Sequence, residues 1–155
     1  HFDEQGASRM VDVGNKEITD RIAIAHAKVI MKTETFNLIM DRKVQKGDVL
    51  EVSRVAGIMA AKQTFALIPM CHPLNITSVK IDYTNNSASE IDIFSEVRVT
   101  GKTGVEMEAI TAATICAITI YDMCKSIDKG MVICDIHLVK KSGGKSGTFV
   151  FGKDT

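Results

Sequence analysis

The chain is organised around residues 101–125, which read GKTGVEMEAITAATICAITIYDMCK. The middle of this stretch, residues 109–120, is apolar or small almost all round and contains no proline, which predicts a helix buried on most of its sides. Thr103 and Glu106 have the spacing of a capping box, in which each side chain satisfies a backbone N–H at the helix start. We therefore expect the helix to run from about residue 104 to about residue 127.

The four ionisable side chains of this helix lie only at its ends. Glu106 and Glu108 are two positions apart, about 200° around a helix, so we expect that they do not both point into one pocket. Asp122 and Lys125 are three positions apart and share a face. They form either an ordinary surface ion pair or, where apolar neighbours desolvate the lysine, a pair tuned for acid–base work.

Helix length limits how these ends are used. Glu106 and Asp122 are sixteen positions apart, or roughly 24 Å at 1.5 Å per residue. Either the two ends belong to two sites, or one site is completed by a neighbouring chain. A long apolar helix with charged ends favours the second alternative and predicts an obligate symmetric oligomer.

Composition places bounds on the function. The chain has 155 residues, enough for one domain with its own core, and a formal net charge of zero, which gives no reason to expect nucleic acid or a membrane as partner. From the sequence we expect that no apolar run approaches the roughly 20 residues of a membrane span. The start is polar and acidic rather than a signal peptide, and because it is not Met we expect further residues before it. We expect reduced thiols at all four cysteines, which are Cys71, Cys116, Cys124 and Cys134.

The pattern along the chain predicts an extended arm over residues 1–14 and a single catalytic domain over residues 15–155. Helical spacing of apolar residues predicts a helix over residues 16–32, and we expect a short helix over residues 33–40. Asp48 with Glu51 three residues on is an Asp variant of the capping box and predicts the start of a helix over residues 48–67. Alternating apolar residues predict strands over residues 76–83, 90–100, 131–140 and 148–151. Helices mixed with hairpin-connected strands indicate an α+β domain with a mainly antiparallel sheet.

Two basic glycine-rich loops are candidate phosphate sites, Gly101-Lys-Thr and Gly144-Lys-Ser. Neither has the preceding glycine of a Walker motif, since those positions hold Glu96 and Val139. Convergent backbone N–H groups and a lysine still bind oxyanions, and the loop KKSGGKSG (residues 140–147) is the better candidate. A solvated turn remains an equal alternative from composition alone.

His72 lies between Cys71 and a proline in a tight loop, a setting that suits proton transfer or substrate contact. Cys71 and His72 could begin a metal site, but no second Cys/His pair occurs at ligand spacing. We interpret His26 and His137 as structural or exposed.

Six segments carry a resemblance to a known family. They are MVDV (10–13), KGDV (46–49), IPMCHPL (68–74), GKTGVEME (101–108), YDMCK (121–125) and KSGGKSG (141–147). In content and order the chain resembles the cyclic pyranopterin monophosphate synthase family, molybdenum cofactor biosynthesis protein C, over nearly its whole length. Three departures are mild: Met70 stands where the family often has Leu, the turn before Lys46 lacks a glycine, and CDIHLV before Lys141 differs from the expected form.

The resemblance implies a ferredoxin-like α+β subunit with a mainly antiparallel sheet packed against helices. It implies a cytoplasmic homo-hexamer, a trimer of dimers, with active sites at subunit interfaces and a small-molecule substrate. The implied reaction converts 3′,8-cyclo-7,8-dihydroguanosine triphosphate to cyclic pyranopterin monophosphate and pyrophosphate, a lyase-type step in molybdenum cofactor biosynthesis. We expect no bound redox cofactor and no structural metal, with Mg²⁺ accompanying the triphosphate left open.

The resemblance also assigns site residues. The catalytic aspartate falls on Asp122 and the catalytic lysines on Lys125 and Lys46, and Lys145 matches a lysine near the triphosphate. Substrate-binding positions fall on Met70, Cys71, His72, Met107 and Glu108, with Glu106 adjacent. Two rival functions remain, a non-catalytic module that holds a triphosphate with the same loops and a purely structural oligomer.

Overall fold

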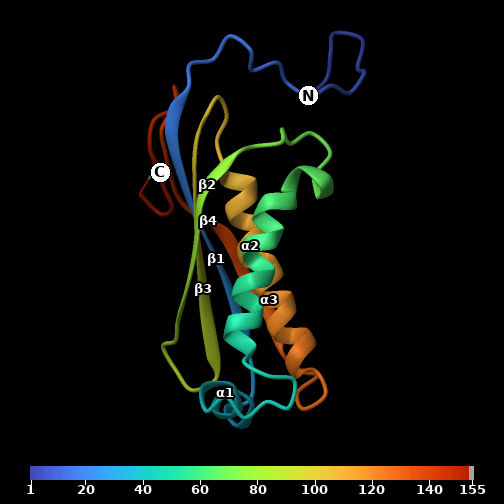
Figure 1. The fold of residues 1–155 in the computed structure, drawn as a ribbon, viewed down its shortest axis with the longest axis vertical. Coiled ribbons are helices and arrows are strands. Elements are labelled where there is room, and N and C mark those ends of the chain that lie inside the picture. Colours follow the sequence, from blue (N-terminus) through green and yellow to red (C-terminus); the bar gives the residue numbers. More distant parts are fainter. Residues whose placement is uncertain (154–155) are drawn as a thin grey trace.

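The computed structural model describes residues 1–153 and has two layers, a five-stranded antiparallel sheet and two long helices that cover one of its faces (Figure 1). The strand order is β2-β3-β1-β4-β5, and α1 lies at one end of the sheet. The strands are β1 (Thr19–Ile30), β2 (Ile76–Thr84), β3 (Glu90–Gly101), β4 (Val132–Ser142) and β5 (Phe149–Val150). The helices are α1 (Thr33–Met40), α2 (Val49–Leu67) and α3 (Glu106–Cys124). The arrangement confirms the α+β, ferredoxin-like prediction.

The helix predicted over residues 16–32 is wrong, because this segment forms β1, the central strand of the sheet. It pairs with β3 over its full length and with β4 on its other side. Ala23, Ala25, Ala27 and Val29 are fully buried, so every second residue faces the helices. Helical spacing of Ile and Val positions concealed this alternation because three of the four inward residues are small alanines.

The core lies between the sheet and α3, whose inner side chains are small and fully buried. Ser95 of β3 donates a hydrogen bond of 2.5 Å to the Ala109 carbonyl, which holds the start of α3 against the sheet. Gly57 lets α2 approach α3 closely, since a Cβ there would lie 2.4 Å from Cys116 Sγ and 3.0 Å from the Ala112 carbonyl oxygen. The small residues of the organising stretch therefore set the spacing between the layers.

By length and composition, α3 is apolar enough to cross a membrane, contrary to the expectation that no run approaches that size. Half of its most apolar 18-residue window is buried inside the fold. Core helices of folded domains pass the same test, and the inner side of α3 is buried in the core of this fold.

The two predicted helix starts differ in outcome. Asp48 caps α2 as predicted, with its carboxylate accepting a hydrogen bond of 3.2 Å from the Glu51 N–H. The prediction of a capping box at the start of α3 is wrong, because Val105 is the N-cap and makes no side-chain capping hydrogen bond. Glu106 pairs instead with Lys141 of β4 at 3.1 Å. All four cysteines are free thiols.

Candidate active site

The C-terminal end of α3 gathers the three residues predicted to be catalytic. Lys125 Nζ lies 2.7 Å from Asp122 Oδ1. Lys46, in the turn before α2, donates a hydrogen bond of 3.0 Å to the Asp122 carbonyl and lies 3.8 Å from its Oδ2 atom. Two ammonium groups from distant parts of the sequence thus converge on one aspartate. We call these three residues the lysine–aspartate cluster.

The lysine–aspartate cluster is open to solvent within a single subunit. The side chains of Asp122 and Lys125 are 58% and 52% exposed. The hydrogen bond and charge of Lys125 lower the pKa of Asp122, and the Asp122 carboxylate raises the pKa of Lys125. Both groups therefore stay ionised near neutral pH. The expected desolvation of the lysine is absent from the isolated chain, because the apolar residues nearby lie on the buried side of α3.

The N-terminal end of α3 borders a pocket of about 270 Å³, which we call the α3 pocket. It is lined by all six residues predicted to bind substrate other than Lys145, namely Met70, Cys71, His72, Glu106, Met107 and Glu108. Glu106 and Glu108 both line it, so the expectation that they point apart is wrong. Glu106 is the first residue of α3, and its carboxylate folds back over Gly104, where a Cβ atom would clash with it.

The segment before β1 holds His72 in the α3 pocket. His72 Nε2 lies 2.7 Å from the Val11 carbonyl oxygen. A carbonyl only accepts, so Nε2 carries the hydrogen and a neutral ring presents Nδ1 as an acceptor. Lys102 donates a hydrogen bond of 2.6 Å to the Gly14 carbonyl and fixes the same segment. These contacts orient one imidazole nitrogen for binding or proton transfer.

Glu108 is the buried carboxylate of the α3 pocket, only 4% exposed. Burial raises its pKa to about 6, and the negative charge of Glu106 adds to the shift. Burial and the charge of Glu108 together raise the pKa of the Cys71 thiol. The α3 pocket therefore holds a carboxyl group that can gain or lose a proton close to neutral pH.

We predict that Glu108→Gln stabilises the fold in a pH-dependent way. The folded state holds the Glu108 proton more tightly than the unfolded state, so its contribution to stability is present below about pH 4.5 and lost as the pH rises through about 6. The free energy of unfolding of the variant, relative to wild type, should therefore rise by about 2 kcal/mol between pH 4 and pH 7. Urea unfolding at fixed protein concentration measures this difference.

The matched control for that experiment is Glu106→Gln, which changes the neighbouring, less buried carboxylate paired with Lys141. Its relative stability should rise by much less between pH 4 and pH 7, because it removes only the smaller contribution of the Glu106 charge to the Glu108 pKa. An equal rise in both variants, or a flat profile for Glu108→Gln, would contradict the assignment of a raised Glu108 pKa.

Lys145 lies in a second pocket of about 530 Å³, which we call the basic pocket. Lys16 and Arg21 line it together with Gly144 and Ser146. Gly144 has a φ of 76°, and a Cβ there would clash with the Arg21 guanidinium, so glycine is required for the loop to pack on Arg21. Lys16 lines both pockets and connects the basic pocket to the α3 pocket. Sequence reasoning missed Lys16 and Arg21 because it placed both in a helix.

The structure thus brings the predicted residues into two groups rather than one. The α3 pocket and the basic pocket share Lys16, and the α3 pocket borders the N-terminal end of α3, whereas the lysine–aspartate cluster lies at its C-terminal end. The helix α3 runs along the length of the sheet (Figure 1). Sixteen positions of α3, from Glu106 to Asp122, separate the groups by roughly 24 Å along the helix axis. Within one chain, the residues of the two pockets therefore do not meet the lysine–aspartate cluster.

These features are typical of an enzyme subunit for a small molecule, with lysine and carboxylate groups lining its pockets and exposed at the end of α3. A family model described as the MoaC family matches residues 10–144, and the chain belongs to this family. Proteins named cyclic pyranopterin monophosphate synthase are similar over 97% of the chain. Those of Desulforapulum autotrophicum, Desulfitobacterium hafniense and Syntrophomonas wolfei are 56%, 58% and 58% identical, with 93%, 92% and 96% of their own lengths covered.

Proposed function

We propose that the chain converts 3′,8-cyclo-7,8-dihydroguanosine triphosphate to cyclic pyranopterin monophosphate with release of pyrophosphate. Its relatives at 56–58% identity carry the name of this synthase. The observation that carries the proposal is the lysine–aspartate cluster, in which Lys125 Nζ contacts Asp122 at 2.7 Å with Lys46 beside it. The reaction needs both proton transfer and charge neutralisation, and this cluster offers both.

The acid–base work falls to the lysine–aspartate cluster. Rearranging a purine-derived ring requires protons to move on and off nitrogen and carbon, which positioned lysine and carboxylate groups accelerate by about 10²- to 10⁴-fold each. A lysine whose pKa is raised by a carboxylate serves first as an acid, since it holds its proton at neutral pH. Asp122 holds that ammonium in place and balances its charge.

The phosphate work falls to the basic pocket. A triphosphate carries up to four negative charges, and Lys16, Arg21 and Lys145 line one cavity, in which three cationic side chains outnumber the single carboxylate of Glu17. Cyclisation requires a substrate hydroxyl to attack the α-phosphorus as pyrophosphate leaves, a step that depends on positioning and charge stabilisation. The adjoining α3 pocket, with His72 and Glu108, then receives the ring portion of the substrate.

The pockets and the lysine–aspartate cluster, as two half-sites, meet when a second copy of the chain packs on the helical face. Val52, Val55 and Met59 of α2 and Ile118 of α3 are about half exposed there, and the three α2 side chains line an apolar hollow. A two-fold contact between helices running in opposite directions places the N-terminal end of one α3 beside the C-terminal end of the other. Each dimer would then hold two complete sites, and three dimers would form the proposed hexamer.

The proposed dimer also changes the solvent exposure of the lysine–aspartate cluster. A second chain over the lysine–aspartate cluster would remove water and supply the desolvation that one subunit lacks. We propose a cytoplasmic enzyme with no resident redox cofactor, in which any Mg²⁺ arrives with the triphosphate. Nucleic acid and membranes are not among the proposed partners.

We expect the purified protein to release one pyrophosphate per cyclic triphosphate consumed, with formation of the cyclic phosphate product. A coupled pyrophosphate assay and mass spectrometry of the product measure both. The rival, a non-catalytic module that only holds the triphosphate, would bind the substrate without releasing pyrophosphate. That result, with saturable binding and no turnover, would refute the proposed activity.

A further inference from the structure

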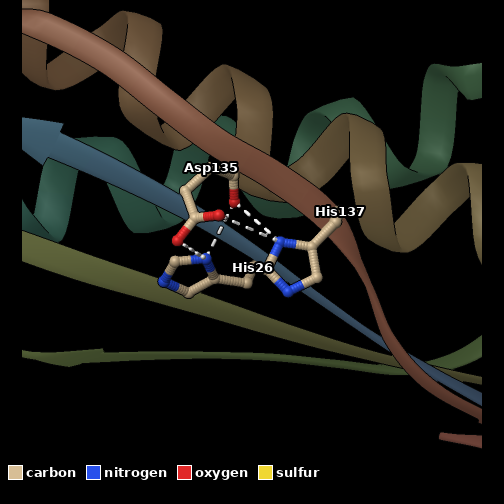
Figure 2. Close-up of side chains that lie close together, drawn as sticks. All are labelled: His26, Asp135 and His137. Atoms are coloured by element: carbon tan, nitrogen blue, oxygen red, sulfur yellow. Dashed lines mark hydrogen bonds and ion pairs between the residues drawn. The ribbon is translucent and has the colours of Figure 1, made fainter. Parts of the chain in front are cut away.

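Two histidines and an aspartate come together on the face of the sheet opposite the helices (Figure 2). His26 of β1 and Asp135 and His137 of β4 place their ligand atoms within 4.8 Å of one another. Asp135 Oδ2 lies 3.7 Å from His26 Nδ1, and Asp135 Oδ1 lies 3.6 Å from His137 Nδ1. We call these residues the sheet triad, and no step of the proposed reaction uses them.

A β-bulge builds the sheet triad. Between the pairs Lys28–Cys134 and His26–His137, one β1 residue faces two β4 residues, Asp135 and Ile136. Asp135 takes up a left-handed backbone with φ of 58°, which non-glycine residues rarely adopt. The bulge turns its carboxylate and its carbonyl toward both imidazoles. Bulges re-aim side chains in this way at functional positions.

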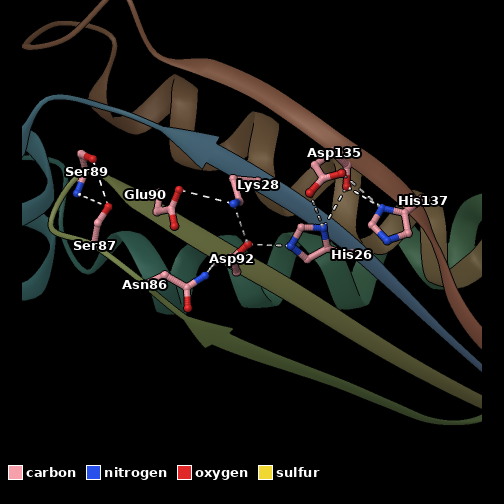
Figure 3. A network of polar contacts seen from close by, with 9 residues as sticks. All are labelled: His26, Lys28, Asn86, Ser87, Ser89, Glu90, Asp92, Asp135 and His137. Carbon is pink, nitrogen blue, oxygen red and sulfur yellow. Dashed lines mark hydrogen bonds and ion pairs between the residues drawn. The ribbon is translucent and has the colours of Figure 1, made fainter. Parts of the chain in front are cut away.

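A second carboxylate fixes the orientation of His26, which is only 5% exposed (Figure 3). His26 Nε2 lies 2.7 Å from Asp92 Oδ1 of β3, so the carboxylate holds a hydrogen on Nε2 and turns Nδ1 toward Asp135. A buried carboxylate behind a histidine is the usual outer-shell partner of a metal-binding imidazole. The centroid of the Phe94 ring lies 4.9 Å from the centroid of the His26 ring, so Phe94 packs against this imidazole and limits its rotation.

The contacts of His26 require an added cation. Its Nδ1 atom lies 2.8 Å from the Asp135 carbonyl oxygen, and its Nε2 atom faces the Asp92 carboxylate, so both ring nitrogens meet groups that only accept. A neutral imidazole has one N–H and cannot satisfy both. Either a second proton or a metal ion resolves the mismatch.

The surroundings favour a doubly charged ion over a single proton. Three carboxylates, those of Glu90, Asp92 and Asp135, are linked here to one ammonium group, that of Lys28, which leaves an excess of two negative charges with both histidines neutral (Figure 3). His137 Nδ1 also turns inward, 3.0 Å from the Asp135 carbonyl oxygen. Two nitrogens and two kinds of oxygen therefore point at one small region.

We infer that the sheet triad binds a first-row divalent metal ion, with Zn²⁺ the best match. Zn²⁺ binds imidazole nitrogen and carboxylate oxygen at about 2.0–2.2 Å, so tetrahedral ligands lie about 3.3–3.5 Å apart. The distances from His26 and His137 to Asp135, each to a different carboxylate oxygen, exceed that by only a few tenths of an ångström, and one ligand atom from each residue lies within 4.8 Å of the others. The ion would tie the central strand to β4, and because Asp135 is 57% exposed, the fourth position opens to solvent. This inference departs from the expectation of no structural metal and does not depend on the proposed reaction.

The test is binding of Zn²⁺ alone to the full chain after chelation and dialysis. We expect one equivalent per chain by titration calorimetry, and a rise in Tm of about 5–10 °C when free Zn²⁺ is about 100-fold above Kd. Co²⁺ should give a visible d–d spectrum typical of nitrogen and oxygen ligands. His137→Gln and Asp135→Asn should each abolish stoichiometric binding, with circular dichroism checking that the variants fold.

Two further variants sharpen the result. Asp92→Asn should weaken Zn²⁺ binding by about 10- to 100-fold without abolishing it, since Asp92 only orients His26. His72→Gln removes a histidine at the other site and should leave the affinity unchanged. Absence of a stoichiometric site would overturn the inference. Loss of binding in His72→Gln, or retention in both triad variants, would also overturn it.

Discussion

Lys125→Ala and Asp122→Ala should each abolish turnover while the subunit stays folded and assembled. The two side chains contact each other at 2.7 Å and are more than half exposed, so their removal opens no cavity in the core. Loss of a proton-transfer group costs about 10²- to 10⁴-fold in rate, and more where the same group also holds a charged substrate. The measurement is kcat from pyrophosphate release, with Tm and sedimentation recorded for each variant.

A matched control separates this effect from the loss of any surface lysine. Lys43 is 70% exposed and pairs with Asp41 at 3.4 Å, so Lys43→Ala removes a comparable ion pair three residues before Lys46. We expect near-normal kcat for this variant. Near-normal product formation by purified Lys125→Ala or Asp122→Ala would refute the catalytic assignment of the cluster.

The sequence predicted those parts of the fold in which local pattern and tertiary environment agree. Asp48 and Glu51 marked the start of α2, and the alternation of Ile91, Ile93, Val97 and Val99 marked β3. The strand β1 was wrongly predicted as a helix because its sequence reflects packing in the folded sheet. It lies between β3 and β4, and burial on the helix side favours alanine there. Alanine at alternate positions carries little strand signal of its own.

The site shows the same division between local and long-range information. Motif resemblance identified His72, Glu108 and Lys145, and the structure places the first two in one pocket and the third in an adjoining one. It could not identify Lys16 and Arg21, because their role depends on packing of the 143–147 loop against the start of β1. No sequence spacing indicates which strand residues will face each other across a sheet.

The sheet triad is the clearest example of such hidden information. His26 and His137 are 111 positions apart and were interpreted as structural or exposed. The pairing of β1 with β4 sets them directly opposite each other, and a bulge in β4 brings the Asp135 carboxylate close to both imidazole rings. Register and bulge position are properties of the folded sheet, so only the structure could bring these three residues together.

Mixing two inactive variants should restore activity if each active site is built from two chains. One chain carries Lys125→Ala, which damages the lysine–aspartate cluster, and the other carries His72→Ala with Lys145→Ala, which damages both pockets. In a two-fold dimer, a site takes its cluster from one chain and its pockets from the other. After random exchange of equal amounts, about one quarter of the sites should combine two intact halves, giving about one quarter of wild-type turnover.

The strength of this experiment lies in its control, a mixture of Lys125→Ala with Asp122→Ala. Both changes lie in the same half-site, so every site in that mixture keeps a damaged cluster and no activity should return. Co-expression with two affinity tags, followed by purification on both, ensures that only hybrid oligomers are assayed. The separation of roughly 24 Å along α3 excludes a small-molecule site formed by both ends of one helix in one subunit. If purified hybrids of the first kind were as inactive as those of the second, the two groups of residues would belong to separate sites, and the proposed two-chain active site would be wrong.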